Sequence, residues 1–236
     1  MLWQVTFLII GAYLLGSVPT AYIAGRALKG IDVRDYGSGS VSGSNVWQSV
    51  SRWAILPVGI ADISKGVIPV LIAWAMGLTL MEEPKLAQGI VGLAAIAGHN
   101  WSIFLGFSGG RGIATMMGVL TILAPWELLV FVGVWLLGIA LFNVPVGGVI
   151  AALALPIASL GFGEPLPLTL CLLAMTLILI AKRLTANRGA LISDWRRVAI
   201  YRLLLDRDVP EREAWICRTP PDLGKSPEEM KETEGK

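Results

Sequence analysis

The chain has 236 residues, of which 55% are hydrophobic and only 15% are charged, and its formal net charge is +2. With a mean hydropathy of +0.68, this composition excludes an ordinary water-soluble domain, which needs a more polar surface at this length. The small net charge gives no reason to expect a nucleic-acid partner. We therefore expect a protein that lies in the lipid bilayer.

Six apolar stretches follow one another along the chain and predict an all-α, polytopic membrane protein. A helix needs about 20 residues to cross the hydrocarbon core, so the fourth stretch is long enough for a hairpin of two short helices. Pro125, Trp126 and Glu127 in its middle are typical of a turn at the membrane surface. The prediction is seven transmembrane helices, two of them short, from stretches 2–25, 53–81, 86–107, 113–142, 144–162 and 166–181.

The connections between these stretches differ in charge from one side of the membrane to the other. By the positive-inside rule the basic set faces the cytoplasm, and an odd number of helices then places the N-terminus outside and the C-terminus inside. We expect a multi-pass membrane protein. The basic set is Arg26, Lys29, Arg34, Arg52, Arg111, Lys182, Arg183 and Arg188, and the opposite set is Glu82, Glu83, Lys85, Glu127 and Glu164.

Three regions are expected. Residues 1–189 form the membrane domain. In residues 190–205 arginines interrupt an apolar pattern, as in an amphipathic juxtamembrane helix on the anionic inner leaflet; a short helix packed on the loops is an equal alternative. Residues 206–236 are charged and contain prolines, which predicts a disordered cytoplasmic tail.

Residues 36–45 read YGSGSVSGSN and are called the serine loop below. Glycines let successive N–H groups converge, and a helix that begins near Ser44 or Asn45 adds the positive end of its dipole, so this loop can hold a phosphate. A flexible linker is an equal alternative from this segment alone. Nucleotide hydrolysis is unsupported, because neither the Walker pattern nor GxGxxG is present. The candidate contacts are Gly37, Ser38, Gly39, Ser44 and Asn45.

Residues 108–115 read SGGRGIAT, the arginine loop, and lead directly into an apolar helix. Arginine suits planar, bidentate contact with phosphate. Because this loop falls on the same predicted membrane face as the serine loop, the two together favour an anionic substrate. Its candidate contacts are Gly109, Gly110, Arg111, Gly112 and Thr115.

Three polar residues lie inside the apolar stretches. Asp62 and Lys65 are three apart, so they share a helix face and can pair. A central charge costs about 2.5 to 3.5 kcal/mol on insertion scales, so these residues need a reason to be there. A role for Lys65 near the phosphate and an ion pair that only locks the helix to its neighbours are equal alternatives. His99, the single histidine, precedes the arginine loop closely enough to join the site, although it also suits a buried hydrogen-bonding role.

The runs GAYLLGSVPTAYIAG, DVRDYGSGSVSGSN, DISKG and AGHNWSIFLGFSGGRGIAT together resemble the bacterial acyl-phosphate:glycerol-3-phosphate acyltransferases of the PlsY type. The second run is similar to that family's first motif, GSGNxGATNxxR, and the fourth to its second motif, GHxxPxFxxFxGGKGxAT. The order and the separation of the two also agree. The resemblance covers residues 2–188.

The resemblance implies transfer of an acyl group from acyl phosphate to the 1-hydroxyl of glycerol 3-phosphate, giving lysophosphatidate. It implies a protein of the bacterial inner membrane that needs neither a cofactor nor a metal, with a site that faces the cytoplasm. We also expect a monomer. Such a reaction mainly requires two phosphates to be held and a hydroxyl to be oriented. The implied catalytic residues are Ser38, His99 and Arg111, and the substrate-binding residues are Gly37, Gly39, Ser44, Asn45, Arg52, Lys65, Gly109, Gly110, Gly112, Thr115, Arg183 and Arg188.

The chain departs from the family pattern at several positions. Arg111 stands where the family has lysine. Gln48 occupies the position of the arginine that ends the family's first motif. Arg52, one helical turn on, is the candidate replacement for that arginine. The third motif, HRxNIxRLxxGxE, is represented only by KRLTANR at residues 182–188, where Lys182 replaces histidine and Thr185 replaces asparagine. The basic positions that fit this motif are Arg183 and Arg188.

Two functional alternatives stay open at the level of the sequence. One is a PlsY-like enzyme with a different acceptor. The other is a protein that binds or carries a phosphorylated ligand or a lipid without catalysis, for which polar residues inside membrane helices are also suited.

Overall fold

The structure is a computed structural model that describes residues 2–186 and 195–207 of the chain. Within these residues every regular element is a helix and there is no strand, which confirms the all-α class. Arg188 and residues 208–236 of the expected tail lie outside the described residues. The helices are α1 (Leu2–Ser17), α2 (Thr20–Lys29), η1 (Val33–Asp35), α3 (Gly43–Ser49), α4 (Ile55–Ala75), α5 (Pro84–Asn100), η2 (Ile103–Leu105), α6 (Ile113–Leu123), α7 (Pro125–Leu141), α8 (Val144–Gly161), α9 (Leu166–Thr185) and α10 (Trp195–Leu205).

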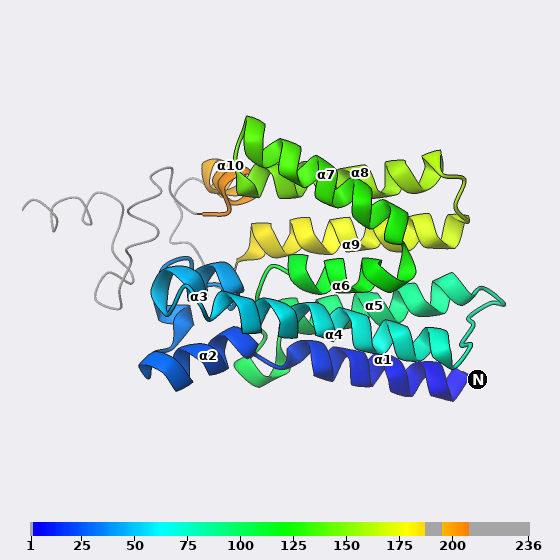
Figure 1. Cartoon of the computed structure of the whole chain (residues 1–236), viewed down its shortest axis with the longest axis horizontal. Coiled ribbons are helices and arrows are strands. Elements are labelled where there is room, and N and C mark those ends of the chain that lie inside the picture. Colours follow the sequence, from blue (N-terminus) through cyan, green and yellow to red (C-terminus); the bar gives the residue numbers. More distant parts are fainter. Residues whose placement is uncertain (1, 187–194, 208–236) are drawn as a thin grey trace, which may run out of the picture.

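The long helices run roughly side by side, with α1 and α4 along one edge of the bundle and α7 and α8 along the other (Figure 1). The short helices α2, α3 and α10 gather at the end of the bundle opposite the N-terminus, which we call the loop end. Four segments are long and apolar enough to cross a membrane, judged by length and composition, and α6 and α7 are shorter apolar helices. The four segments are Leu2–Lys29, Ile55–Ala75, Val144–Gly161 and Leu166–Thr185.

The first apolar stretch is not one continuous helix. It breaks at Val18 and Pro19, between α1 and α2, because proline has no N–H to donate and its ring disfavours helical backbone in the residue before it. The break places Thr20, the first residue of α2, at the level of the loop end where the site lies.

The fourth stretch forms two helices, as expected, and they meet at Ala124. Pro125 occupies the first position of α7, where its missing N–H is not needed. Trp126 is exposed, but Glu127 is only 1% exposed. The expectation that Glu127 is a surface charge in the turn is therefore wrong: it lies inside the first turn of α7 and faces the protein.

Small residues allow the central helices to approach closely. A Cβ at Gly66 of α4 would overlap the carbonyl oxygen of Thr115, and one at Gly118 of α6 would overlap that of Ile63. Such contacts between small residues are the usual way in which helices associate in a membrane. They fix α6, and with it the arginine loop at its start, directly against α4.

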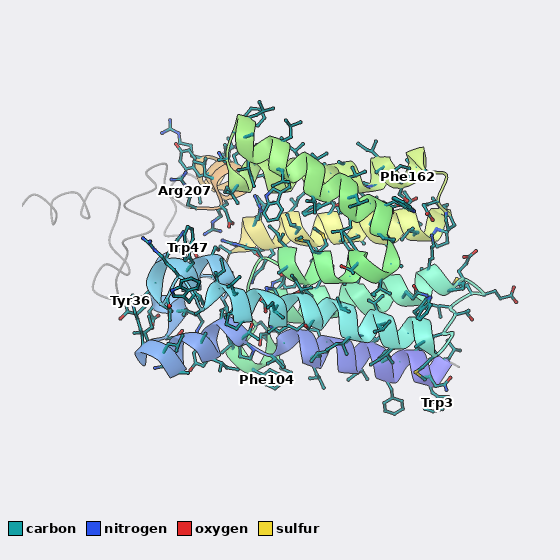
Figure 2. All side chains as sticks on the ribbon, viewed as in Figure 1. Trp3, Tyr36, Trp47, Phe104, Phe162 and Arg207 are labelled. Atoms are coloured by element: carbon teal, nitrogen blue, oxygen red, sulfur yellow. The ribbon has the colours of Figure 1, made fainter. Side chains whose placement is uncertain are left out.

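The outer surface of the bundle is apolar. Trp3 and Phe7 are 65% and 68% exposed, and many leucines and isoleucines on α7, α8 and α9 are also exposed. Lipid tolerates such a surface, whereas water does not. Trp3 and Phe162 lie at the N-terminal end of the bundle, and Tyr36, Trp47 and Arg207 lie at the loop end (Figure 2).

Candidate active site

The serine loop presents a row of hydroxyl groups. Ser38, Ser40, Ser42 and Ser44 are spaced two apart, and neighbouring Oγ atoms lie 2.8, 2.7 and 3.1 Å from one another. Gly37 and Gly39 adopt left-handed backbone with φ of 50° and 65°, which is accessible to glycine without strain. The loop thus has a defined conformation, with its four hydroxyl groups on one side.

Asn45 holds this loop in place. It is fully buried, and its Nδ2 donates to the carbonyl oxygens of Val33, Tyr36 and Ser40 at 2.8, 3.2 and 3.0 Å. Ser49 in turn donates to Asn45 Oδ1 at 3.1 Å. The amide N–H groups therefore serve the loop itself, and a direct contact between Asn45 and a substrate stays a prediction.

The serine loop and the arginine loop meet. The N–H of Val41 donates to the carbonyl oxygen of Gly109 at 3.2 Å, and the N–H of Gly110 donates to that of His99 at 3.0 Å. A Cβ at Gly110 would overlap His99 Nε2 and would lie 2.8 Å from the carbonyl oxygen of Val41. Only glycine fits between the two loops and the imidazole, so the packing of this residue defines the junction.

A buried polar network lies beside this junction. Asp62 Oδ1 accepts from Thr20 Oγ1 at 2.6 Å and from Lys65 Nζ at 2.6 Å, and Lys65 also donates to Thr20 Oγ1 at 3.0 Å. His99 Nδ1 faces the same carboxylate oxygen at 3.6 Å. The predicted pairing of Asp62 with Lys65 is confirmed. Thr20 was not predicted, although a hydroxyl directly after a membrane proline is a signal that sequence reasoning can use.

Thr20, Lys65 and His99 of this network line one small pocket at the loop end. Its wall includes the break between α1 and α2, the start of the arginine loop, and the end of α5. Lys65 and His99 are 4% and 7% exposed, so the pocket holds a base and a cation largely away from solvent. The residues that line it include Thr20, Val41, Lys65, His99, Ser102 and Gly109.

Arg111 leaves the arginine loop in another direction. It is 8% exposed; its Nε lies 2.9 Å from Asp206 Oδ1, and its Nη1 donates to the carbonyl oxygen of Lys182 at 3.1 Å. Asp206 was not predicted, because it lies 95 positions further along the chain, in a segment without apolar periodicity. The guanidinium is thus bordered by the end of α9 and the residue after α10.

Two buried polar side chains stand at the start of α6. Within the described residues, neither amide atom of Asn100 has a hydrogen-bond partner, and the hydroxyl of Thr115 has none either. Both side chains are fully buried. A Cβ at Gly112, whose φ is 77°, would lie 2.6 Å from Asn100 Oδ1. Polar side-chain atoms near the N-terminus of α6 are therefore available to form hydrogen bonds with a phosphate.

The remaining predicted residues lie further from the junction. Arg183 is 2% exposed, and its Nη1 donates to the carbonyl oxygens of Pro145 and Leu203 at 2.8 and 3.1 Å. Arg52 is exposed just after α3. The pocket lining does not include Arg52 or Arg183, nor the predicted catalytic residues Ser38 and Arg111. Contacts of these four residues with a substrate stay predictions.

An apolar helical bundle with a polar site at one end, made by two glycine-rich loops, defines a helical membrane protein that handles an anionic ligand. A sequence model described as glycerol-3-phosphate acyltransferase matches residues 6–193. The chain is 38% identical over 227 residues to glycerol-3-phosphate acyltransferase 5 of Dehalococcoides mccartyi, covering 92% of this chain and 95% of that protein. It is 43% identical over 152 residues to glycerol-3-phosphate acyltransferase of Trichlorobacter lovleyi, covering 64% and 75%.

Solved structures agree with this assignment. The fold is similar to PlsY, described as an integral membrane glycerol 3-phosphate acyltransferase, in its glycerol 3-phosphate form. The TM-score is 0.72 at 29% identity, covering 87% of this chain and 94% of that one. The lysophosphatidic acid form gives a TM-score of 0.69. The chain belongs to the glycerol-3-phosphate acyltransferase family.

Proposed function

We propose that this protein transfers an acyl group to glycerol 3-phosphate and so forms lysophosphatidate in phospholipid synthesis, with acyl phosphate as the donor. Membership in the family and the similarity to PlsY structures with glycerol 3-phosphate and with lysophosphatidic acid support the acceptor and the product. Acyl phosphate is already activated, so the reaction needs phosphate binding, orientation of the hydroxyl and a proton acceptor.

The observation that carries the proposal is the junction of the two loops at His99. Val41 and Gly109 join the loops, and the histidine ring packs on Gly110. Lys65 lines the same pocket. The serine loop and the arginine loop, both of a phosphate-binding type, therefore border one ionisable base, His99. This is the minimum arrangement for joining two phosphorylated substrates.

In this proposal the hydroxyl oxygen of glycerol 3-phosphate attacks the carbonyl carbon of acyl phosphate. The bond from that carbon to the bridging oxygen breaks, and inorganic phosphate leaves with this oxygen. His99 accepts the hydroxyl proton, and Asp62, which faces its Nδ1, stabilises the imidazolium that forms. The hydroxyl of Ser38 and the cation of Arg111 stabilise the phosphates and the negative charge that develops on the carbonyl oxygen.

We infer that the protein has seven transmembrane helices, with α1 and α2 as the first span, and that its site faces the cytoplasm. In support, the basic residues of the connections lie near α2, α3, the arginine loop and the end of α9, and the positive-inside rule assigns this end to the cytoplasm. The N-terminus then lies outside. The protein acts as a monomer in the inner membrane, and its apolar outer surface keeps the acyl chain of donor and product within lipid.

The test is turnover by purified protein with palmitoyl phosphate and glycerol 3-phosphate in the absence of added metal. Lysophosphatidate measured by mass spectrometry is the expected product. The variant Gly110→Ala should lower the rate about 100-fold, because a Cβ displaces His99 and separates the loops. The matched control is Gly133→Ala on α7, where a Cβ meets no atom within 4 Å and the rate should stay that of the unmodified protein.

Absence of lysophosphatidate from the unmodified protein would contradict the proposed function and would favour a binder or carrier. A product formed only with another polyol phosphate would move the proposal to a different acceptor. Equal rates for the two glycine variants would show that the loop junction is not the site.

A further inference from the structure

A cluster of basic side chains is buried at the loop end where α9 ends. Arg111, Lys182 and Arg183 are 8%, 1% and 2% exposed. Buried cations that lie together destabilise one another unless an anion is near. Asp206 supplies a carboxylate to this cluster, through the ion pair of 2.9 Å between its Oδ1 and Arg111 Nε.

The segment that carries Asp206 is firmly attached. α10 packs against α8 and α9. Arg202 Nη1 donates to the carbonyl oxygen of Leu184 at 2.7 Å, and Arg183 Nη1 donates to that of Leu203 at 3.1 Å. Asp206 itself, with φ of 56°, ends the helix in the left-handed conformation that aspartate tolerates better than most residues. The backbone that carries Asp206 is therefore docked beside the end of α9.

The planar shape of the Arg111 guanidinium explains why a carboxylate beside it can orient this side chain. A lysine, which the family motif carries here, has a single nitrogen, whereas a guanidinium has five N–H groups in a rigid plane. Asp206 therefore pairs with one edge of this plane, at Nε, and the carbonyl of Lys182 accepts a hydrogen bond from another part of it, Nη1.

We propose that Asp206 is a positioning residue: it holds Arg111 by its Nε edge so that the terminal N–H groups face a substrate phosphate. This inference rests on the proposed function. It also gives α10 a role, since this helix lies beyond residue 193, where the match to the family model ends. The arginine and the terminal segment then form one unit that replaces the lysine of the family motif.

The experiment measures kcat and KM for both substrates in the full-length protein and its variants. Asp206→Asn should lower kcat/KM at least about tenfold through a freely rotating Arg111, and Asp206→Glu should recover part of it. Arg111→Lys should also be poor, because the single ammonium pairs with Asp206. The double variant Arg111→Lys with Asp206→Asn should then exceed Arg111→Lys alone, since it restores an unpaired lysine.

The control is Glu82→Gln, an acid-to-amide change at an exposed residue between α4 and α5, which should leave the kinetics unchanged. A rate for Asp206→Asn equal to or above that of the unmodified protein would overturn the proposal and would make Asp206 neutral or inhibitory. Equal losses from Asp206→Asn in the arginine and lysine backgrounds would also overturn it, because Asp206 would then act independently of Arg111.

Thermal stabilisation by glycerol 3-phosphate or inorganic phosphate provides a readout without turnover. Asp206→Asn should weaken the rise in Tm, and Glu82→Gln should not. Without turnover by the unmodified protein the proposed function fails, while this binding measurement still decides the role of Asp206: an unchanged rise in Tm for Asp206→Asn contradicts it.

Discussion

Two ion pairs in the described part of the chain, Asp62 with Lys65 and Arg111 with Asp206, differ in how the chain builds them. Asp62 and Lys65 lie one turn apart on α4, and their side chains are both 4% exposed. Arg111 and Asp206 are brought together by a loop and a terminal segment, and their side chains are 9% and 24% exposed. The first pair forms wherever α4 forms, whereas the second exists only while α10 is docked. One pair therefore belongs to the scaffold, and the other can be changed without disturbing the scaffold.

The largest effect is expected from breaking the pair on α4. Lys65→Met leaves Asp62 buried without its cation and should lower the free energy of unfolding by about 3 to 5 kcal/mol. The double variant Asp62→Asn with Lys65→Met should recover most of this loss, because no uncompensated charge remains. Thermal unfolding in detergent micelles measures both. A double variant as unstable as Lys65→Met would show that the pair itself, and not the orphaned charge, stabilises the bundle.

A smaller effect on stability is expected from Asp206→Asn. Because this pair is partly exposed, its loss should cost about 1 kcal/mol at low salt. The difference from the unmodified protein should shrink in 1 M salt, where the screening length falls to about 3 Å, while the effect of Lys65→Met should stay. A loss as large as that of Lys65→Met would contradict the distinction between the two pairs.

The smallest effect belongs to a third pair, in the partly exposed turn before the serine loop. Asp32 accepts from Arg34 N, Nε and Nη2 at 3.0, 3.0 and 2.7 Å. Burial by itself would raise the pKa of Asp32, but these hydrogen bonds and the charges of Arg34 and Arg26 hold that pKa below its ordinary value. The folded protein thus favours the carboxylate, so its contribution is complete above the unfolded pKa of about 3.9 and is lost as pH falls through the folded value.

Asp32→Asn should accordingly lower stability by about 0.5 to 1 kcal/mol at pH 7. Thermal unfolding followed from pH 7 downward should show the two proteins converge below about pH 4. A difference that persists unchanged in acid would mean that the amide disturbs the turn by its shape and not by its charge.

Hydropathy and charge predicted much of this fold, because membrane helices must satisfy their backbone within each segment. The split of the fourth stretch at Pro125 could be predicted because the stretch is too long for one span and carries a proline in its middle. The break at Pro19 could not, since a single proline near the end of a long apolar run does not reveal whether a helix continues. The burial of Glu127 also escaped prediction, because it depends on which face of α7 meets its neighbours.

The candidate site could likewise be predicted from the sequence only in part. Asp62 with Lys65 followed from helical spacing, and His99 with the arginine loop followed from closeness in sequence. The contact of Val41 with Gly109 required the tertiary fold. The pairing of Arg111 with Asp206 left only one signal in the sequence, the arginine that stands at a family lysine, and a substitution of that kind does not identify its partner.

The most direct test of the account follows the bridging oxygen of the donor. Purified protein is given glycerol 3-phosphate and palmitoyl phosphate that carries ¹⁸O between the carbonyl carbon and phosphorus, and the products are analysed by mass spectrometry. Attack at the carbonyl carbon, as proposed, predicts that the label appears in inorganic phosphate and that lysophosphatidate is unlabelled. Label retained in palmitate, or no lysophosphatidate at all, would contradict acyl transfer at this site.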